Sequence, residues 1–338
     1  MPDSFPFLHL PFVSQRLVFG TMPVIDILQF SSCSARTERL VKSLRIPMKS
    51  IQFHDCSTES AENYFRIFSN NKINGSEDFV RIFVMDEGTL RKTFVKTRSP
   101  VIWLCRNVQA SYFTVRINTW WISNHHRLAV STKAREVKIV MTKLMKHFAG
   151  LFLYEDVRLI TIPKWLFFRK TWMWFSNIKK VNILSDKKEL TEYQMKVILG
   201  DLNTRDLVID CPVVPEFRYD PTKIIQFNHL FLNNPLWLTM QNFSSMDCAH
   251  LSISYNEAPK FPLVSELIWR WTRSELLENL QVLSVRTEQP FPNDYLENVF
   301  RLVHFYLNPN DVLGIRRSKD GRQATATCSR KLFTFVVN

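Results

Sequence analysis

Apolar residues recur at helical spacing through the first fifty residues and predict three short helices. The first runs from Pro11 to about Met22, because proline is tolerated in a first helical turn, whose N–H groups have no partner in the helix. Pro23 restarts the chain before a second apolar stripe, and Ser34 is a suitable N-cap for a third helix. Helices of about forty residues in total bury too little surface to be stable alone. We therefore expect either the rest of the chain or a partner protein to cover them.

Residues 50–130 change to β-branched and aromatic runs with polar residues interleaved, a pattern typical of strands. Residues 74–75 and 86–88 are glycine-containing turn signals between such runs. The expected strands, which we take to form an antiparallel meander, include residues 79–85, 101–105 and 112–121. Helical spacing returns over residues 134–150.

From residue 154 onward one short apolar pattern repeats. Each copy has an apolar or small residue, two other residues, an apolar residue, one other residue and a final apolar residue. Six copies begin at Tyr154, Ile178, Thr204, Phe227, Cys248 and Leu277. Their central positions are 24, 26, 23, 21 and 29 residues apart, within the roughly 20–29-residue period of leucine-rich repeats. Helical patterns fill most of the gaps, at 164–175, 189–199, 236–246 and 263–277.

A strand followed by a helix, repeated, buries one face of each strand and leaves the alternate positions open on a parallel sheet. Six residues occupy such open positions and are our candidates for binding a target: Arg158, Asn182, Val208, Phe231, Ser252 and Gln281. The alternative is an ordinary α/β domain without regular curvature.

The seven glycines are too widely spaced for a phosphate-binding loop. No two lie within five positions of each other, whereas nucleotide-binding loops and the Gly-x-Ser-x-Gly elbow of hydrolases need closely spaced glycines. The sequence also lacks the His-Glu-x-x-His motif and the Cys-x-x-Cys pairs that zinc sites use. We therefore predict a protein that is not an enzyme, with no catalytic residues, no metal site and no cofactor.

The six cysteines are scattered through the chain, which favours free and mostly buried thiols in a reducing compartment, the cytoplasm or the nucleus. Prolines interrupt the apolar N-terminus, so it is a poor secretory signal. No stretch approaches the roughly 18–20 uninterrupted apolar residues of a membrane span. We therefore expect no membrane partner.

The net charge of +13 is unevenly distributed. Residues 133–188 hold 13 Lys or Arg against four Asp or Glu, and residues 301–338 hold seven against two. A concentrated basic surface indicates either nucleic acid or an acidic protein as a partner. Nucleic acid is the less favoured, because a helix over 164–175 would turn its aromatic residues inward and its basic residues outward. Those aromatic residues are Trp165, Phe168, Trp172 and Phe175.

Residues 5–45 resemble the F-box of the large nematode-type families. The matching features are Phe5-Pro6-x-Leu8-x-Leu10-Pro11, Met22-Pro23, Phe30-Ser31-x-Cys33-Ser34 and a basic helix from Arg36 to Leu44. The resemblance implies a three-helix module that docks on the Skp-family adaptor of SCF ubiquitin ligases. It assigns to that module's small core and to the adaptor groove, without dividing them, Leu8, Leu10, Pro11, Val13, Leu17, Val24, Ile25 and Leu28.

Two further segments resemble elements of the same families. Residues 242–285 resemble the type-2 F-box-associated region, although the glycine usual after the tryptophan is absent after Trp271. Residues 315–325 resemble a terminal element of the family, and their alternation around Asp320-Gly321 predicts a β-hairpin.

These patterns predict an α/β protein in four parts. An F-box would occupy residues 1–48, a β-rich segment 49–132, an irregular leucine-rich-repeat-like solenoid of strands and helices 133–310, and the terminal β-hairpin 311–338. The expected function is a substrate-recognition adaptor that binds a Skp-family adaptor, and through it a cullin, and also a protein target. The alternatives are an F-box scaffold that packs only within its own chain and a basic nucleic-acid-binding protein.

Overall fold

A computed structural model describes most of the chain. The described residues are 9–31, 33–54, 63–73, 76–86, 104–110, 113–122, 125–132, 137–160, 178–184, 189–256, 261–295, 306–307 and 313–338. They form two compact units, Met1–Lys179 and Lys180–Asn338.

The first unit begins with three helices, α1 (Phe12–Thr21), α2 (Val24–Ser31) and α3 (Ala35–Leu44), and these confirm the three predicted helices. Ser34 caps α3 as predicted. Its hydroxyl accepts a hydrogen bond from the Thr37 backbone N–H at 3.1 Å, and the Ser34 N–H donates to the Thr37 hydroxyl at 2.9 Å. This reciprocal pair satisfies two backbone donors that the helix start would leave without partners.

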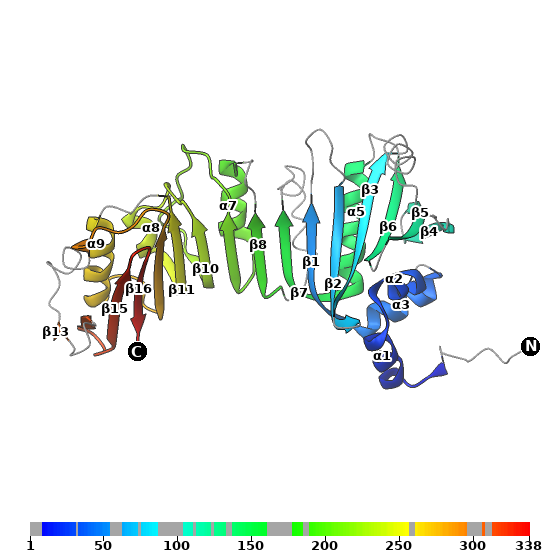
Figure 1. Cartoon of the computed structure of the whole chain (residues 1–338), viewed down its shortest axis with the longest axis horizontal. Coiled ribbons are helices and arrows are strands. Elements are labelled where there is room, and N and C mark those ends of the chain that lie inside the picture. Colours follow the sequence, from blue (N-terminus) through cyan, green and yellow to red (C-terminus); the bar gives the residue numbers. More distant parts are fainter. Residues whose placement is uncertain are drawn as a thin grey trace, which may run out of the picture. The chain divides into compact units, whose positions relative to one another are not determined.

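The sheet of the first unit has seven strands among the residues that the structure describes, and Figure 1 shows their arrangement. They are β1 (Ile46–His54), β2 (Asn63–Ile73), β3 (Ser76–Asp86), β4 (Leu104–Ala110), β5 (Phe113–Ile122), β6 (His125–Thr132) and β7 (Phe152–Ile160). Within this unit the strand order is β7-β1-β2-β3-β6-β5-β4. β1 pairs with β7 in parallel. Helix α5 (Val137–Leu151) connects β6 to β7, the parallel neighbour of β1.

The predicted meander is right within β1–β3 and within β4–β6, and wrong where the two meet. Neighbouring strands are antiparallel within each group. However, β3 pairs with β6 rather than β4, and it does so in parallel. Alternation along a strand fixes which side chains share a face, but it does not choose the neighbouring strand, so the sequence pattern could not give this pairing.

The helices of the first unit share its core with the sheet. The predicted apolar stripe of α5 is confirmed for Val140, Met141, Leu144 and Phe148, which are all buried; the side chain of its fifth member, Val137, lies outside the described part of the structure. Helix α2 contacts β2 and β3, and α3 contacts α5. The chain itself therefore covers much of the N-terminal helical module.

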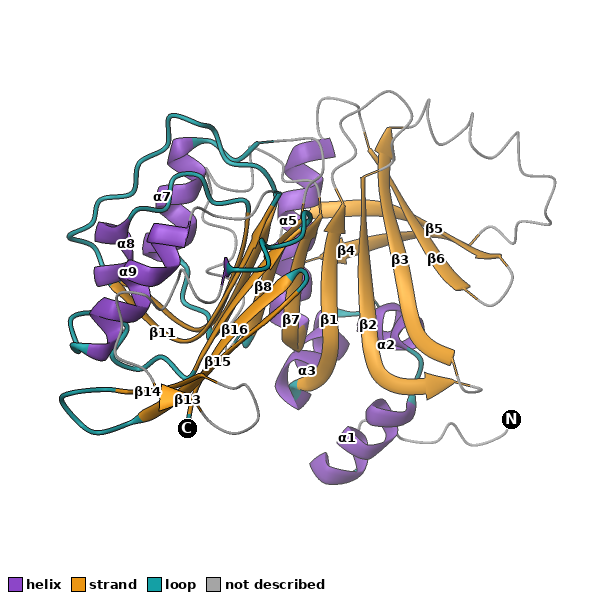
Figure 2. Cartoon of the chain, turned by 60° about the vertical axis from the view of Figure 1, so that its left-hand side comes forward, coloured by secondary structure: helices purple, strands orange, loops and turns teal. Residues whose placement is uncertain are grey.

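The second unit carries five parallel strands in sequence order: β8 (Lys180–Leu184), β9 (Asp206–Asp210), β10 (Ile225–Asn233), β11 (Met246–Tyr255) and β12 (Val282–Thr287). Helices α7 (Glu192–Asp201), α8 (Met240–Ser244) and α9 (Phe261–Thr272) gather on one side of these strands (Figure 2). A helix separates β8 from β9, β10 from β11 and β11 from β12, whereas the described residues between β9 and β10 form no helix. The helix predicted over 164–175 lies outside the described residues.

Antiparallel strands complete the sheet of the second unit. β16 (Leu332–Val337) pairs with β12, β15 (Gln323–Ser329) with β16, and β14 (Leu313–Arg316) with β15. The two-residue strand β13 (Tyr306–Leu307) pairs with β14. The hairpin between β14 and β15 confirms the prediction at Asp320-Gly321. Gly321 has φ +72°, a conformation that glycine adopts without a steric penalty.

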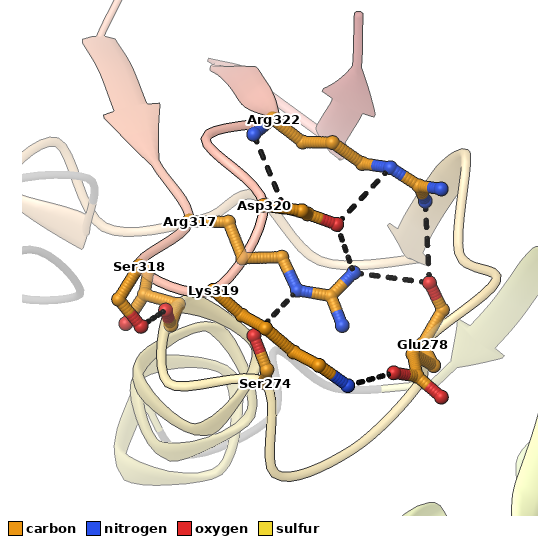
Figure 3. A network of polar contacts seen from close by, with 8 residues as sticks. Ser274, Glu278, Arg317, Ser318, Lys319, Asp320 and Arg322 are labelled. Atoms are coloured by element: carbon orange, nitrogen blue, oxygen red, sulfur yellow. Dashed lines mark hydrogen bonds and ion pairs between the residues drawn. The ribbon is translucent and has the colours of Figure 1, made fainter.

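Arg317 anchors this hairpin to the turn that follows α9 (Figure 3). Its side chain is 1% exposed, and its Nε donates to the Ser274 hydroxyl at 2.9 Å while its Nη1 donates to the Glu278 carbonyl at 3.0 Å. The guanidinium lies over the ring of the buried Trp271, 5.4 Å from the centroid. A buried cation needs such partners because desolvation disfavours its charge, and here they hold the terminal hairpin against the core.

Candidate functional site

Helix α1 presents an apolar surface to solvent. Phe12, Val13, Leu17 and Val18 are 50%, 69%, 68% and 40% exposed, and we call these four residues the α1 surface. The only buried residues of α1 are Gln15 and Phe19. At 100° per residue the apolar side chains point to more than one side of the helix, and a helix of this kind is normally buried. Contiguous exposed apolar residues mark interaction sites.

Helix α2 has the opposite arrangement. Val24, Ile25, Ile27 and Leu28 are at most 7% exposed, and they lie on the helix that contacts β2 and β3. These side chains therefore form part of the core of the first unit.

The structure divides the predicted adaptor-binding residues between the exposed side of α1 and the core of the first unit. Pro11, Val13 and Leu17 are exposed and Leu10 is half-buried, whereas Val24, Ile25 and Leu28 are buried. Leu8 lies outside the described residues. The predicted adaptor-binding residues did not include Phe12 and Val18 of the α1 surface. The signal that could have found them is that the apolar residues of α1 surround the helix and do not form one stripe.

A buried carboxylate ties the inner side of the module to the rest of its unit. Glu38 on α3 lies 2.6 Å from Lys42 Nζ on the same helix and 3.4 Å from His147 Nδ1 on α5. The hydrogen bond from His147, followed by that from Lys42, lowers the pKa of Glu38 to about 2 against the opposing effect of burial. All three helices contact their own unit, since α1 also contacts β1 and α3, but the four residues of the α1 surface stay exposed.

A second surface lies on the face of β8–β12 that is not covered by their helices, and we call it the open face. Asn182, Val208, Phe231 and Ser252 align in register across β8, β9, β10 and β11. The repeat's apolar residues on these strands, such as Leu207 and Leu230, are buried on the other face. The structure therefore brings four of the six predicted target-binding residues into one row.

The other two predicted residues are placed differently. Gln281 precedes β12, and the residue aligned with Ser252 is Ser284. The sixth repeat was predicted in the wrong frame. Leu283 and Val285 align with Leu251 and Ile253 of the preceding repeat and, unlike Val282, are buried. Both frames satisfy the same apolar pattern, so spacing alone could not choose between them.

Arg158 belongs to the first unit. It lies on β7 in register with Gln52 of β1, and its Nε is 2.7 Å from Asp156 Oδ2.

The open face contains a pocket of about 540 Å³, lined by the row from Asn182 to Ser252 and by a second row of polar side chains. The second row includes Lys180, Asp206, His229 and His250, which are aligned across β8 to β11. The two imidazole rings are stacked, with centroids 4.1 Å apart and planes inclined by 14°. Burial, and then the neighbouring His229, lower the pKa of His250.

Sequence reasoning missed this second row although the signal was present. Each of its members lies two positions before a predicted open-face residue. Because side chains alternate along a strand, a step of two keeps the same face, and extending each predicted position backwards would have found all four.

Free thiols are present as expected. Cys211 and Cys248 are buried, and burial raises the pKa of each to about 12, which makes them unreactive. Cys33 is exposed and Cys328 is half-buried. Among the described residues there is no group of three side chains that could hold a metal ion. None of the described helices is long and apolar enough to cross a membrane.

Comparison with known protein families identifies the N-terminal module. Residues 7–49 match the F-box domain. The match spans α1, α2 and α3 and the start of β1. Neither the curated proteins nor the solved structures provide a match to the chain. The resemblance of residues 242–285 to a type-2 F-box-associated region is not shown by these comparisons and stays a prediction.

The α1 surface therefore belongs to an F-box domain. All three F-box helices contact their own unit: α1 contacts β1, α2 contacts β2 and β3, and α3 contacts α5. The exposed apolar side chains of α1 remain as the surface through which this domain can contact another protein.

Proposed function

We propose that the chain is a substrate-recognition adaptor of an SCF-type cullin ubiquitin ligase. The α1 surface would dock on a Skp-family adaptor, and the open face of residues 180–338 would bind a protein target. F-box domains bind Skp-family adaptors, so the match at residues 7–49 supports the first half. An adaptor performs no chemistry itself, because it acts by raising the effective concentration of the target near the ubiquitin-transferring enzyme.

One observation carries the proposal: the four residues of the α1 surface are 40–69% exposed within an F-box domain whose other helices are covered by their own chain. An F-box scaffold that packs only within its own chain would bury them. The exposure of α1 therefore favours docking on a partner over that alternative.

Nucleic-acid binding has less support. The basic segment 133–188 that motivated it includes residues 161–177 and 185–188, which lie outside the described residues. Among the described residues of this segment, 137–160 and 178–184, no contact between a basic and an aromatic side chain supports nucleic-acid binding.

The proposal includes a leucine-rich-repeat-like solenoid and a type-2 F-box-associated region as the part of the chain that binds the target. Parallel strands in sequence order with helices on one side suit a repeat architecture, which exposes an extended face for binding. The target on that face is a protein.

Co-purification tests the docking half. The full chain is co-expressed with a Skp-family adaptor, and the mass of the complex is determined by light scattering. We expect a stoichiometric complex for the natural chain and none for the double variant Val13→Glu, Leu17→Glu, whose substitutions lie on an exposed surface and leave the fold intact. A monodisperse monomer of the natural chain, or undiminished complex formation by the double variant, would refute the assignment.

A further inference from the structure

We propose that the pocket on the open face receives a positively charged side chain, arginine or lysine, from an extended segment of the target protein. The inference rests on the proposed function, because it names the chemistry of the target at the surface assigned to it. Four observations carry it: the charge of the pocket, a carboxylate oxygen without a partner, the flat rings beside it, and the volume.

The charge of the pocket is opposite in sign to that of the chain. Asp206 and Asp210 line it together with Lys180, so with neutral histidines its side chains sum to a net negative charge, whereas the chain carries +13. Exposed charges more than about 8 Å apart are largely screened at physiological ionic strength. A ligand in the pocket therefore responds mainly to the charges that line it, which are the two aspartates and Lys180.

Asp206 contributes an oxygen that lacks a hydrogen-bond partner. Its Oδ1 is buried and accepts no hydrogen bond among the described residues. Asp210 differs, because its Oδ1 accepts from Asn233 Nδ2 at 2.7 Å. Buried carboxylate oxygens are normally satisfied, and leaving one without a donor is unfavourable. Asp206 lines the pocket, so a rotation of its side chain would bring this oxygen to a guanidinium or ammonium group that enters there and supplies the donor.

Flat side chains lie next to this carboxylate. Phe231 aligns with Val208 across β9 and β10, two positions from the aligned pair Asp206 and His229. His229 is stacked on His250. Aromatic faces attract guanidinium and ammonium groups and also pack against the aliphatic stem of arginine or lysine. The pocket volume of about 540 Å³ suits a small number of side chains rather than a folded domain.

Lys180 allows a test of whether the ligand in the pocket is positively charged. It is aligned with Asp206 on the neighbouring strand, and it forms no ion pair with any described residue. A cationic ligand must approach against its charge. Removing the charge of Lys180 should therefore strengthen binding, whereas removing the charge of Asp206 should weaken it.

The experiment uses the full chain in complex with its Skp-family adaptor and three fluorescent peptides, measured by anisotropy. The peptides share the sequence Gly-Ser-Leu-X-Leu-Ser-Gly, with X as arginine, glutamine or glutamate. We expect the arginine peptide to bind at least about tenfold more tightly than the glutamine peptide, and the glutamate peptide to bind most weakly.

Three variants locate the effect. Asp206→Asn should abolish the preference for arginine over glutamine, and Lys180→Gln should tighten binding of the arginine peptide about threefold or more. Glu216→Gln removes an exposed carboxylate outside the pocket lining and should change nothing. Equal binding of the arginine and glutamine peptides, a preference for glutamate, or no binding of any peptide at millimolar concentration would overturn the proposal.

Lowering the pH gives an independent readout. His250 faces Asp206 on β9, His229 on β10 and Gln281 before β12, and Lys180 and Asp210 also line the pocket. The pKa of His250 lies below its ordinary value of 6.5, so His250 adds positive charge to the pocket only as the pH falls below that value, and binding of the arginine peptide should weaken there. Tighter binding at pH 5.5 would contradict the proposal.

Failure of this inference is distinguishable from failure of the proposed function. Asp206→Asn and Lys180→Gln leave the α1 surface untouched, so both variants should still co-purify with the adaptor. If no adaptor complex forms, the same peptide titrations on the isolated full chain test the pocket alone.

Discussion

Helices α1 and α2 are neighbours in one F-box domain, are similarly short and are both rich in apolar residues, yet they are used differently. Ile25 on α2 is 1% exposed, whereas Leu17 on α1 is 68% exposed. Phe19 is the one apolar residue of α1 that is buried, with its ring 5.2 Å from that of Phe30. The difference shows that apolar residues in this domain serve two purposes, stabilising the chain itself and contacting a partner, and burial separates the two.

The sheet of residues 180–338 repeats this division across its two faces. The covered face carries buried apolar residues such as Leu207 and Leu230, and the open face carries polar and charged residues such as Asp206 and His229. An apolar surface on α1 fits a stable docking partner, while a polar pocket fits selective recognition of a target. The experiments below separate residues that hold the fold from residues that are free to bind.

The largest expected effect is a loss of stability after a substitution in α2. Ile25→Ala removes a buried side chain and leaves a cavity, so we expect the free energy of unfolding to fall by about 2–5 kcal/mol. Leu17→Ala on α1 should change it by less than about 0.5 kcal/mol, because the side chain is exposed. Urea denaturation of both variants measures the difference. Similar losses for the two would mean that α1 packs within the chain.

Adaptor binding, unlike stability, should depend on the exposed residues of α1. Leu17→Ala truncates an exposed apolar side chain on the proposed docking surface, and we expect adaptor affinity to fall by about 2 kcal/mol, or roughly thirtyfold. Leu236→Ala is the matched control, because Leu236 is 75% exposed on the second unit. It should bind the adaptor normally in a calorimetric titration. Equal losses in the two variants would remove α1 from the interface.

Glu38 should have an intermediate, pH-dependent effect on stability. Its pKa in the folded protein is about 2, below the ordinary value of 4.5, so its stabilising contribution is present above pH 4.5 and is lost as the pH falls towards 2. Glu38→Gln should therefore cost about 1–3 kcal/mol near pH 7, and the gap from the natural chain should shrink below pH 4.5.

Glu192→Gln provides the control for this pH dependence. Glu192 pairs with Lys196 on the exposed surface of α7, where such pairs contribute little to stability. Denaturation at a series of pH values should show a small effect for Glu192→Gln at every pH. A pH-independent cost of Glu38→Gln would show that its ion pairs do not provide the stability.

The smallest effect concerns Gly20, an exposed glycine near the end of α1. A Cβ added there would meet no atom within 4 Å. Because glycine is less favourable than alanine inside a helix, Gly20→Ala should raise the free energy of unfolding by up to about 1 kcal/mol. Adaptor affinity should stay the same or increase, since the bound helix is better formed. A loss of stability in thermal denaturation would contradict the exposed placement of this residue.

Local signals in the sequence predicted the elements well, whereas the partners of those elements were harder to predict. The cap at Ser34 and the turn at Gly321 depend on nearby atoms, and both were found. The parallel pairing of β3 with β6 depends on residues far apart in sequence, and no local pattern encodes it. The sixth copy of the repeat was predicted in the wrong frame because Leu280 fits the apolar pattern in two ways, as the central residue of one copy or as the first residue of another.

The candidate site was predicted in part for the same reason. Alternation along β8–β11 placed Asn182, Val208, Phe231 and Ser252 on one face, and the register of the strands then brought them into one row. Which F-box residues face outward was not predicted, because α1 and α2 are both short and rich in apolar residues. The signal that was missed is that the apolar residues of α1 surround the helix and do not form one stripe.

Hydrogen–deuterium exchange of the full chain, with and without a Skp-family adaptor, tests most directly whether α1 is the docking element. At a stoichiometric ratio we expect exchange of the α1 amides, Phe12–Thr21, to slow at least about tenfold, since binding orders an exposed helix. The amides of α2 and of β10 should be unchanged. A complex that leaves α1 exchange unaltered, or protects only residues within 180–338, would contradict docking through the F-box.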